Sequence, residues 1–303
     1  MKTLKRTTLA IACLGMINVN AQTLDLAGAV QLALQSHPSI QAKRMESAAA
    51  DQTATGSLWQ MAPGVSFTRG KNTFGQDATT TRFSQPLFMG GRLVSTVKES
   101  LAKRDVADSE LLAAQQDIIS RVTESYADLM RLQKNQETAH VNQEEHKRLL
   151  DMIQRRNTSG LSSDNDVVLA NMRYQQARAE FEQVQALADT QRAVLEDLIS
   201  QSIPPQQKLP PPPTKRIELK TLDEARALAL SFAPQVAAQR NKATAAEARV
   251  GIERSTLFPQ VYLRHEKYNG DGMRNVGDQT FIAVEYQFGS GVSSAYAWSA
   301  AIN

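Results

Sequence analysis

The sequence has 303 residues, with 34 Lys and Arg against 31 Asp and Glu, and its single cysteine is Cys13. Three of the basic residues lie within residues 1–21, so the rest of the chain carries 31 charges of each sign and shows no bias toward a nucleic-acid partner. Without a cysteine after residue 21, that part of the chain has neither disulfides nor thiolate chemistry.

Residues 1–21 predict a secretory signal peptide. They combine a positively charged start, an apolar stretch at residues 9–17 and a small-residue cleavage site that ends at Ala21. The alternative, a short N-terminal membrane helix, would need about 20 apolar residues. No later segment is apolar for long enough to predict a transmembrane helix, so we expect an exported chain that stays in the periplasm or crosses the outer membrane as β-strands.

The remaining sequence contains an internal repeat. Residues 26–34, LAGAVQLAL, return as residues 222–230, LDEARALAL, and two later prolines keep the same spacing of 196. We therefore predict four segments: the signal peptide at 1–21, a first repeat at 22–202, a Pro-rich extended linker at 203–214, and a second repeat at 215–303.

Each repeat begins with two helices and a β-hairpin. A helix over residues 26–36 ends at His37-Pro38, because the residue before proline is pushed out of the helical region, and a second helix runs to about residue 60. Alternating apolar residues then predict hairpins at about 64–88 and about 260–288, with strands of the length that a tilted membrane β-strand needs. The predicted strands are 64–71, 79–88, 260–268 and 280–288.

A long helical hairpin follows at about 92–200. Residues 92–156 contain no Gly or Pro, and apolar residues at every seventh position predict a buried stripe through Leu112, Ile119 and Tyr126, with Val122 and Leu129 between them. The return helix is predicted to be capped by Asp164 or Asn165. Its heptad seam is Ala170, Tyr174, Ala177, Phe181, Val184, Ala188, Gln191, Leu195 and Leu198.

The turn of this helical hairpin is the candidate docking site for a partner. It contains Gly160, Leu161, Ser162, Asp164 and Asp166. Helix reversal and capping explain the same residues, and the two interpretations are compatible. The sequence predicts no catalytic, cofactor or metal site, since it has no HExxH, paired CxxC or phosphate-binding glycine loop, and His140 and His146 do not share a helix face.

Four predicted strands cannot close a membrane barrel, and open strand edges are not tolerated in lipid. Three copies would supply twelve strands, an even number within the range of outer-membrane barrels. The pattern therefore predicts a homotrimer.

The residues that carry these features resemble the TolC family of outer-membrane efflux and secretion channels. The similar stretches are LAGAVQLALQSHPSI with its repeat LDEARALALSFAPQV, APGVSF, FPQVYL, QPLFMGGR, and SGLSSDNDVVLANMRYQQARAEF at the helical turn. The resemblance implies a mainly α fold with a small β part: antiparallel coiled-coil helices form an α-barrel protomer, and β-hairpins contribute four strands to a trimeric twelve-stranded barrel.

The resemblance also implies function and partners. It predicts a passive channel in the outer membrane of a Gram-negative cell, surrounded by lipid, with its helices in the periplasm. A periplasmic adaptor would bind the helical tips, and an inner-membrane pump, ABC-type or proton-driven, would supply the energy. The stretch VEYQFGSGVSSAYA resembles channels of type I secretion systems that export adhesins, so the cargo is either a polypeptide or a small compound.

One departure from the family is expected to matter. The second long helical pair is missing after the second hairpin, so we expect a truncated chain that conducts poorly. The alternatives are a periplasmic coiled-coil structural or adaptor protein, a non-functional truncated channel, and, least favoured, a secreted enzyme.

Overall fold

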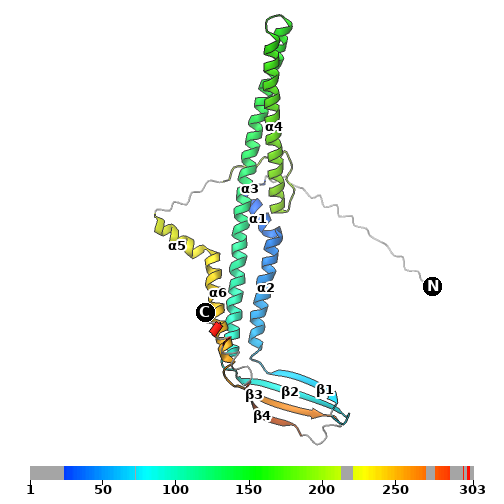
Figure 1. Cartoon of the computed structure of the whole chain (residues 1–303), viewed down its shortest axis with the longest axis vertical. Helices are drawn as coiled ribbons and strands as arrows, with labels where there is room; N and C mark the ends of the chain where they lie inside the picture. The colour runs from blue at the N-terminus through cyan, green and yellow to red at the C-terminus, as the bar shows by residue number, and fades with distance from the viewer. Residues whose placement is uncertain are drawn as a thin grey trace, which may run out of the picture. The chain divides into compact units, whose positions relative to one another are not determined.

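The computed structural model describes residues 24–71, 73–212, 221–270, 277–286, 296 and 299–300. The fold is mainly helical with one small β-sheet, as the sequence predicts (Figure 1). The predicted signal peptide at 1–21 and most of residues 284–297 lie outside the described residues. The elements are α1 (Leu26–Ser36), α2 (Pro38–Trp59), β1 (Gly64–Lys71), β2 (Asp77–Phe88), α3 (Arg92–Thr158), α4 (Asp164–Ile199), α5 (Leu222–Phe232), α6 (Pro234–Ser255), β3 (Gln260–Asn269) and β4 (Gln279–Glu285).

Proline sets the boundary between the first two helices of each repeat. His37 is in an extended conformation and caps α2, where its ring nitrogen Nδ1 accepts a hydrogen bond from the Ser39 N–H at 3.2 Å. Pro38 occupies the first turn of α2, where a missing N–H leaves no bond unmade. Pro234 begins α6 in the same way. The predicted break at His37-Pro38 is therefore confirmed.

Residue contacts divide the chain into two compact units. The hairpin unit contains Thr123–Asp197 and Gln201–Pro213, together with the chain up to Ala29. The sheet unit contains Val30–Val122, Leu198–Ser200 and the chain from Thr214 onward. These units cut across the two sequence repeats, because elements from both repeats meet in the sheet unit.

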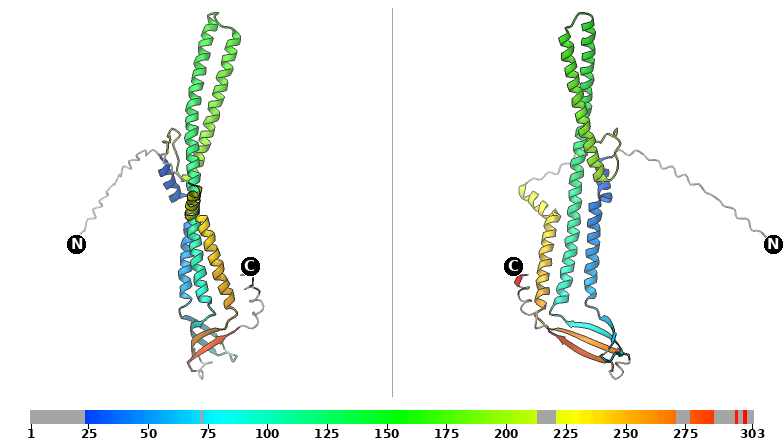
Figure 2. Two further views of the ribbon diagram at one scale, coloured as in Figure 1. Left: turned by 90° about the vertical axis from the view of Figure 1, so that its left-hand side faces the viewer. Right: turned by 45° about the vertical axis from the view of Figure 1, so that its right-hand side comes forward.

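In the sheet unit, α2, the first half of α3, and α6 run side by side, and the sheet lies at one end of them (Figures 1 and 2). The strand order is β1-β2-β3-β4, and every neighbouring pair is antiparallel. The central pair, β2 with β3, joins the first repeat to the second. Its register shifts between Pro86 and Phe88, a position where a strand accommodates proline.

The connection from β2 to α3 depends on glycine. Gly90 and Gly91 have φ angles of 59° and 87°, in the left-handed region that favours glycine. A Cβ on Gly90 would lie 2.7 Å from the Ser255 carbonyl oxygen and 2.9 Å from the Cβ of Phe258. Gly90 therefore lets this turn approach the end of α6 more closely than any other residue would allow.

In the hairpin unit, the second half of α3 packs antiparallel against α4 (Figures 1 and 2). All nine positions of the predicted α4 seam are buried or half-buried, which confirms its heptad pattern. None of the helices in the described ranges is long and apolar enough to cross a membrane.

The predicted stripe on α3 is wrong at two positions. Tyr126 is fully buried, as are Val122 and Leu129, but Leu112 is 55% exposed and Ile119 is 37% exposed. Ile118, the neighbour of Ile119, is buried instead. Either isoleucine satisfies an apolar heptad, and the rotation of α3 against its neighbours selects which one is more deeply buried.

The Pro-rich linker lies against α3 within the hairpin unit. Residues 203–212 form no helix or strand, and Leu209 is buried. The Gln133 side-chain amide donates to the Gln207 carbonyl at 2.8 Å, and its oxygen accepts from the Leu209 N–H at 3.1 Å. The Tyr126 hydroxyl donates to the Pro210 carbonyl at 2.7 Å, and burial raises the pKa of Tyr126 to about 12.

Candidate docking site at the helical tip

The turn between α3 and α4 brings together the five residues predicted as a docking site, which are Gly160, Leu161, Ser162, Asp164 and Asp166. It begins with a Schellman motif, in which the Leu161 N–H donates to the Arg156 carbonyl and the Gly160 N–H to the Asn157 carbonyl, both at 2.8 Å. Gly160 has a φ of 73°, so the predicted helix stop at this glycine is confirmed.

Helix α4 begins with a capping box formed by Ser163 and Asp166. The Asp166 N–H donates to the Ser163 hydroxyl at 3.2 Å, and the Ser163 N–H donates to the Asp166 carboxylate at 3.0 Å. The prediction that Asp164 or Asn165 caps this helix is therefore wrong. The signal was present in the sequence as a serine followed three residues later by an acidic residue.

Both aspartates of the predicted set accept hydrogen bonds inside the turn. The Asn157 side-chain amide donates to the Asp164 carboxylate and to the Ser162 carbonyl, each at 3.0 Å. The Ser162 hydroxyl donates to the Asp166 carboxylate at 3.0 Å. The Ser163 N–H, followed by the side chains of Ser163 and Ser162, holds the pKa of Asp166 below its ordinary value. The two carboxylates thus stabilise the shape of the turn.

The same turn exposes apolar side chains. Leu161 is 71% exposed at the tip, and Val168 and Met172, four residues apart on one face of α4, are also exposed. Arg155 and Arg156 supply positive charge in the last turn of α3. The turn thus presents an exposed leucine beside charged residues on a hydrogen-bonded frame.

His140 takes part in the packing between two helices. In the part of the chain that the structure describes, no group of three or more His, Cys, Asp or Glu side chains could hold a metal ion. His140 lies edge-on to Phe181, with ring centroids 5.4 Å apart, and so belongs to the packing between α3 and α4.

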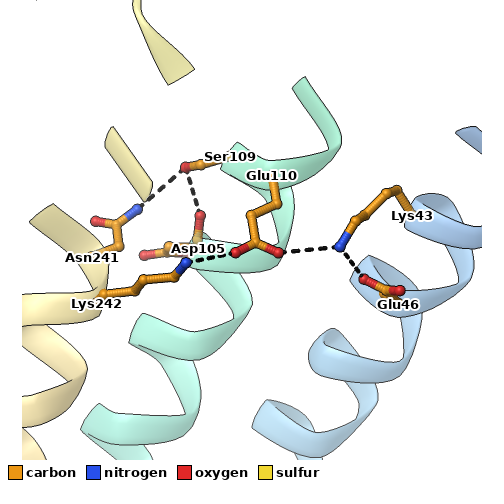
Figure 3. A network of polar contacts seen from close by, with 7 residues as sticks. All are labelled: Lys43, Glu46, Asp105, Ser109, Glu110, Asn241 and Lys242. Atoms are coloured by element: carbon orange, nitrogen blue, oxygen red, sulfur yellow. Dashed lines mark hydrogen bonds and ion pairs between the residues drawn. The ribbon is translucent and has the colours of Figure 1, made fainter. Parts of the chain in front are cut away.

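The sheet unit contains a polar network that no motif in the sequence predicts. Figure 3 shows Glu110 of α3 between Lys43 of α2 and Lys242 of α6, with N–O distances of 3.3 Å and 2.8 Å. Beside it, the Asn241 side-chain amide donates to the Ser109 hydroxyl at 3.4 Å. Hydrogen bonds from Lys242 and then Lys43 lower the pKa of Glu110. The network aligns three helices that no local sequence pattern connects.

The sheet separates its side chains into two kinds of face. Register pairs place Ser66, Arg82, Glu266 and Gln279 in one row across all four strands. We call this side the charged face, which also holds Arg264 and Glu285. The alternate rows form the apolar face, where large exposed apolar side chains predominate along the middle of the strands; these are Val65, Phe67, Phe83, Leu263, Ile282 and Val284. The charged residues of this face, Arg69, Lys71, Asp77 and Lys267, lie toward the turn between β1 and β2 and the end of β3.

A long helical hairpin joined to a short antiparallel sheet is the architecture of known outer-membrane channels. The chain is similar to the outer-membrane channel OprN, with a TM-score of 0.75 and 19% identity over 91% of this chain and 67% of that one. The outer membrane protein VceC of Vibrio cholerae gives a TM-score of 0.70 and 21% identity over 91% of this chain and 73% of VceC. The MtrE outer membrane channel of Neisseria gonorrhoeae gives a TM-score of 0.69 and 15% identity over 91% of this chain and 67% of MtrE.

The family follows from a separate comparison. The family model for outer membrane efflux proteins matches residues 29–201, more than half of the chain. The protein belongs to this family of TolC-like channels, which are not enzymes. A comparison with curated proteins found no match.

Proposed function

We propose that the protein is the outer-membrane component of a tripartite export system and a passive conduit for its cargo. Residues 1–21 direct the chain out of the cytoplasm and are then removed. Three copies combine their sheets into one twelve-stranded barrel in the outer membrane, and the helices extend into the periplasm. An inner-membrane pump, ABC-type or proton-driven, supplies the energy.

The two-faced, open-edged sheet is the observation that carries this proposal. Among the strands that the structure describes, β1 and β4 each have one neighbour, so both edges carry free N–H and C=O groups. A sheet in lipid must close on itself, because unpaired backbone groups are too costly there. The exposed apolar face suits contact with lipid, and the charged face suits contact with water. The smallest membrane barrels have 8 strands, and three copies of this sheet supply twelve.

We assign the helical tip to docking of the periplasmic adaptor. In this assignment Leu161 makes the apolar contact, Gly160 permits the reversal, and Ser162, Asp164 and Asp166 maintain the turn that presents it. Leu161→Glu is expected to reduce cross-linking to the adaptor strongly, because a carboxylate is costly to bury in an apolar contact, while Leu222→Glu, at a still more exposed leucine on α5, leaves it unchanged. Undiminished cross-linking of the Leu161→Glu protein would remove the tip from the interface.

Two cargo classes fit this conduit. One is a polypeptide exported by type I secretion, which the resemblance of residues 284–297 favours, and the other is a small toxic compound. A strain lacking the gene would separate them: loss of one secreted protein from the medium supports the first, and raised sensitivity to toxic compounds with unchanged secretion supports the second.

The proposal is tested by the native mass of the protein extracted in mild detergent from purified outer membranes. A trimer that migrates faster before boiling than after supports a closed barrel. A monomer, an aggregate, or absence from the outer-membrane fraction would overturn the proposal.

A further inference from the structure

Resting on the proposed channel, we infer that the charged face of the sheet lines the lumen as a self-neutralising belt centred on Glu266, and that the balance of charges in this belt sets the preference of the pore between cations and anions. The belt consists of Arg82, Arg264, Glu266 and Glu285, two charges of each sign in every protomer. Its ligands are small ions and charged groups of the cargo.

Glu266 is the centre of this belt. Only 6% of Glu266 is exposed, although it lies on one face of a four-stranded sheet, because its neighbours on that face surround it. Arg82, its register partner on β2, donates through Nε to one carboxylate oxygen, and the Tyr268 hydroxyl donates to the other. A buried carboxylate between an arginine and a tyrosine stays charged and fixed in position.

Arg264 extends the belt to β4. Its guanidinium lies 2.6 Å from the Glu285 carboxylate and 4.8 Å from the ring centroid of Tyr262, a cation–π geometry. Arg264 and Glu266 are two residues apart on β3, so their side chains point to the same side of the sheet. Positive and negative groups therefore alternate from β2 across β3 to β4.

The opposite face identifies which side meets lipid. Phe83 and Leu263, each one residue from a member of the belt, are exposed on the apolar face. Arginine and glutamate are strongly disfavoured near the middle of the lipid side of a membrane barrel, whereas the interior is polar. The charged residues of the apolar face, such as Arg69 and Lys267, lie toward the strand ends, where the cost of a charge is small. Closing the sheet with its apolar face outward therefore places the belt in the lumen.

The balance of charge gives a measurable consequence. The intact belt has no net charge, so it favours neither cations nor anions. Glu266→Gln removes one negative charge per protomer and leaves Arg82 without its partner, so each trimer gains three uncompensated positive charges. Rings of charged side chains set the ion preference of pores, and this variant should therefore favour anions.

The test is the reversal potential of the full chain in planar bilayers under a KCl gradient. Glu266→Gln is expected to shift it toward the chloride equilibrium potential, Arg82→Gln toward that of potassium, and the double variant back to the wild-type value. Glu285→Gln removes an exposed carboxylate from the same face and must shift the reversal potential in the same direction as Glu266→Gln. Because Glu285 is exposed, this variant tests the inference without disturbing the buried Glu266. The matched control is Lys267→Gln, next to Glu266 but on the other face, which should leave the potential unchanged.

The outcomes separate the inference from the function on which it rests. Conducting trimers whose reversal potential is the same in wild type, Glu266→Gln and Glu285→Gln overturn the inference and leave the channel intact. A larger shift in Lys267→Gln than in Glu266→Gln overturns it as well, because the faces are then reversed. A wild-type protein that inserts without conducting contradicts the proposed function, and the inference fails with it.

Discussion

The N–H of Ser163 donates to the carboxylate of Asp166, and the N–H of Asp166 donates back to the hydroxyl of Ser163. At the start of α4, where backbone donors lack helical partners, this exchange gives the Ser163 N–H an acceptor and gives the Asp166 N–H a second acceptor beside the Ser163 carbonyl. It lies at the turn we assign to adaptor docking, so the geometry of that surface depends on a pair of short polar side chains.

Ser163→Ala should destabilise the first turn of α4 by about 0.5–2 kcal/mol, because alanine cannot accept the N–H of Asp166. Ser163→Gly is the matched comparison and should cost only a few tenths of a kcal/mol, since glycine is tolerated at this position. Native-state hydrogen exchange of the Asp166 amide measures both. Equal exchange rates in the alanine variant and the wild type would contradict the capping role.

The tip should loosen in acid. Because the native pKa of Asp166 lies below its unfolded value, its contribution to stability is fully present above the unfolded pKa and is lost as the pH falls through the native pKa. Protection of the amides of residues 163–166, measured as exchange relative to the intrinsic rate at each pH, should therefore fall below about pH 4, the ordinary value for aspartate. Asp166→Asn should remove most of this pH dependence, and a dependence that persists in that variant would point to another group.

Glu110 should couple three helices. Lys43→Gln and Lys242→Gln each remove one of the two ion pairs of Glu110, whose side chain is partly exposed. Each pair is expected to contribute about 0.2–1 kcal/mol to the free energy of unfolding. Double-mutant cycles of each lysine with Glu110→Gln, read from denaturant unfolding, measure the two couplings. Coupling energies of zero for both pairs would show that the network in Figure 3 adds nothing to stability.

Tyr126 should hold the Pro-rich linker against α3. Tyr126→Phe keeps the ring but leaves the Pro210 carbonyl without its donor, at an expected cost of about 1–3 kcal/mol. Faster exchange of the Leu209 N–H would report the release. In the wild type, the native pKa of about 12 lies above the ordinary value, so stability should be retained below about pH 10 and fall as the pH rises toward 12.

A lysine should reduce trimer formation at Phe83 of β2 but not at the neighbouring Ser84. Phe83→Lys places an ammonium on the apolar face, which costs about 2–4 kcal/mol near the middle of a bilayer, and should reduce the amount of trimer in the outer membrane. Ser84→Lys places the same group on the charged face and should be tolerated. Heat-modifiable trimer is the readout, and equal yields from both variants would show that the two faces do not meet different solvents.

The sequence by itself determined the features that depend on neighbours along the chain. Pro38 separates α1 from α2 because a proline ring excludes the helical conformation of the preceding residue, and Gly160 ends α3 because the turn there needs a left-handed residue. Alternation of apolar residues located β1 and most of β2, because successive side chains of a strand point to opposite faces and the pattern is local. The capping box at Ser163 was equally local, and was missed because the neighbouring acidic residues also suit a helix start.

Only the tertiary structure decided the contacts between distant residues. Ile118 is buried and Ile119 is partly exposed because α3 is rotated by the helices beside it, and a heptad pattern does not specify that rotation. Glu110 meets lysines from both repeats, and Glu266 meets Arg82 through the pairing of β2 with β3. Charged residues that lie far apart in the sequence, as these pairs do, show no repeating pattern from which their pairing could be predicted. Their partners are selected by helix packing and strand register, which exist only once the chain has folded.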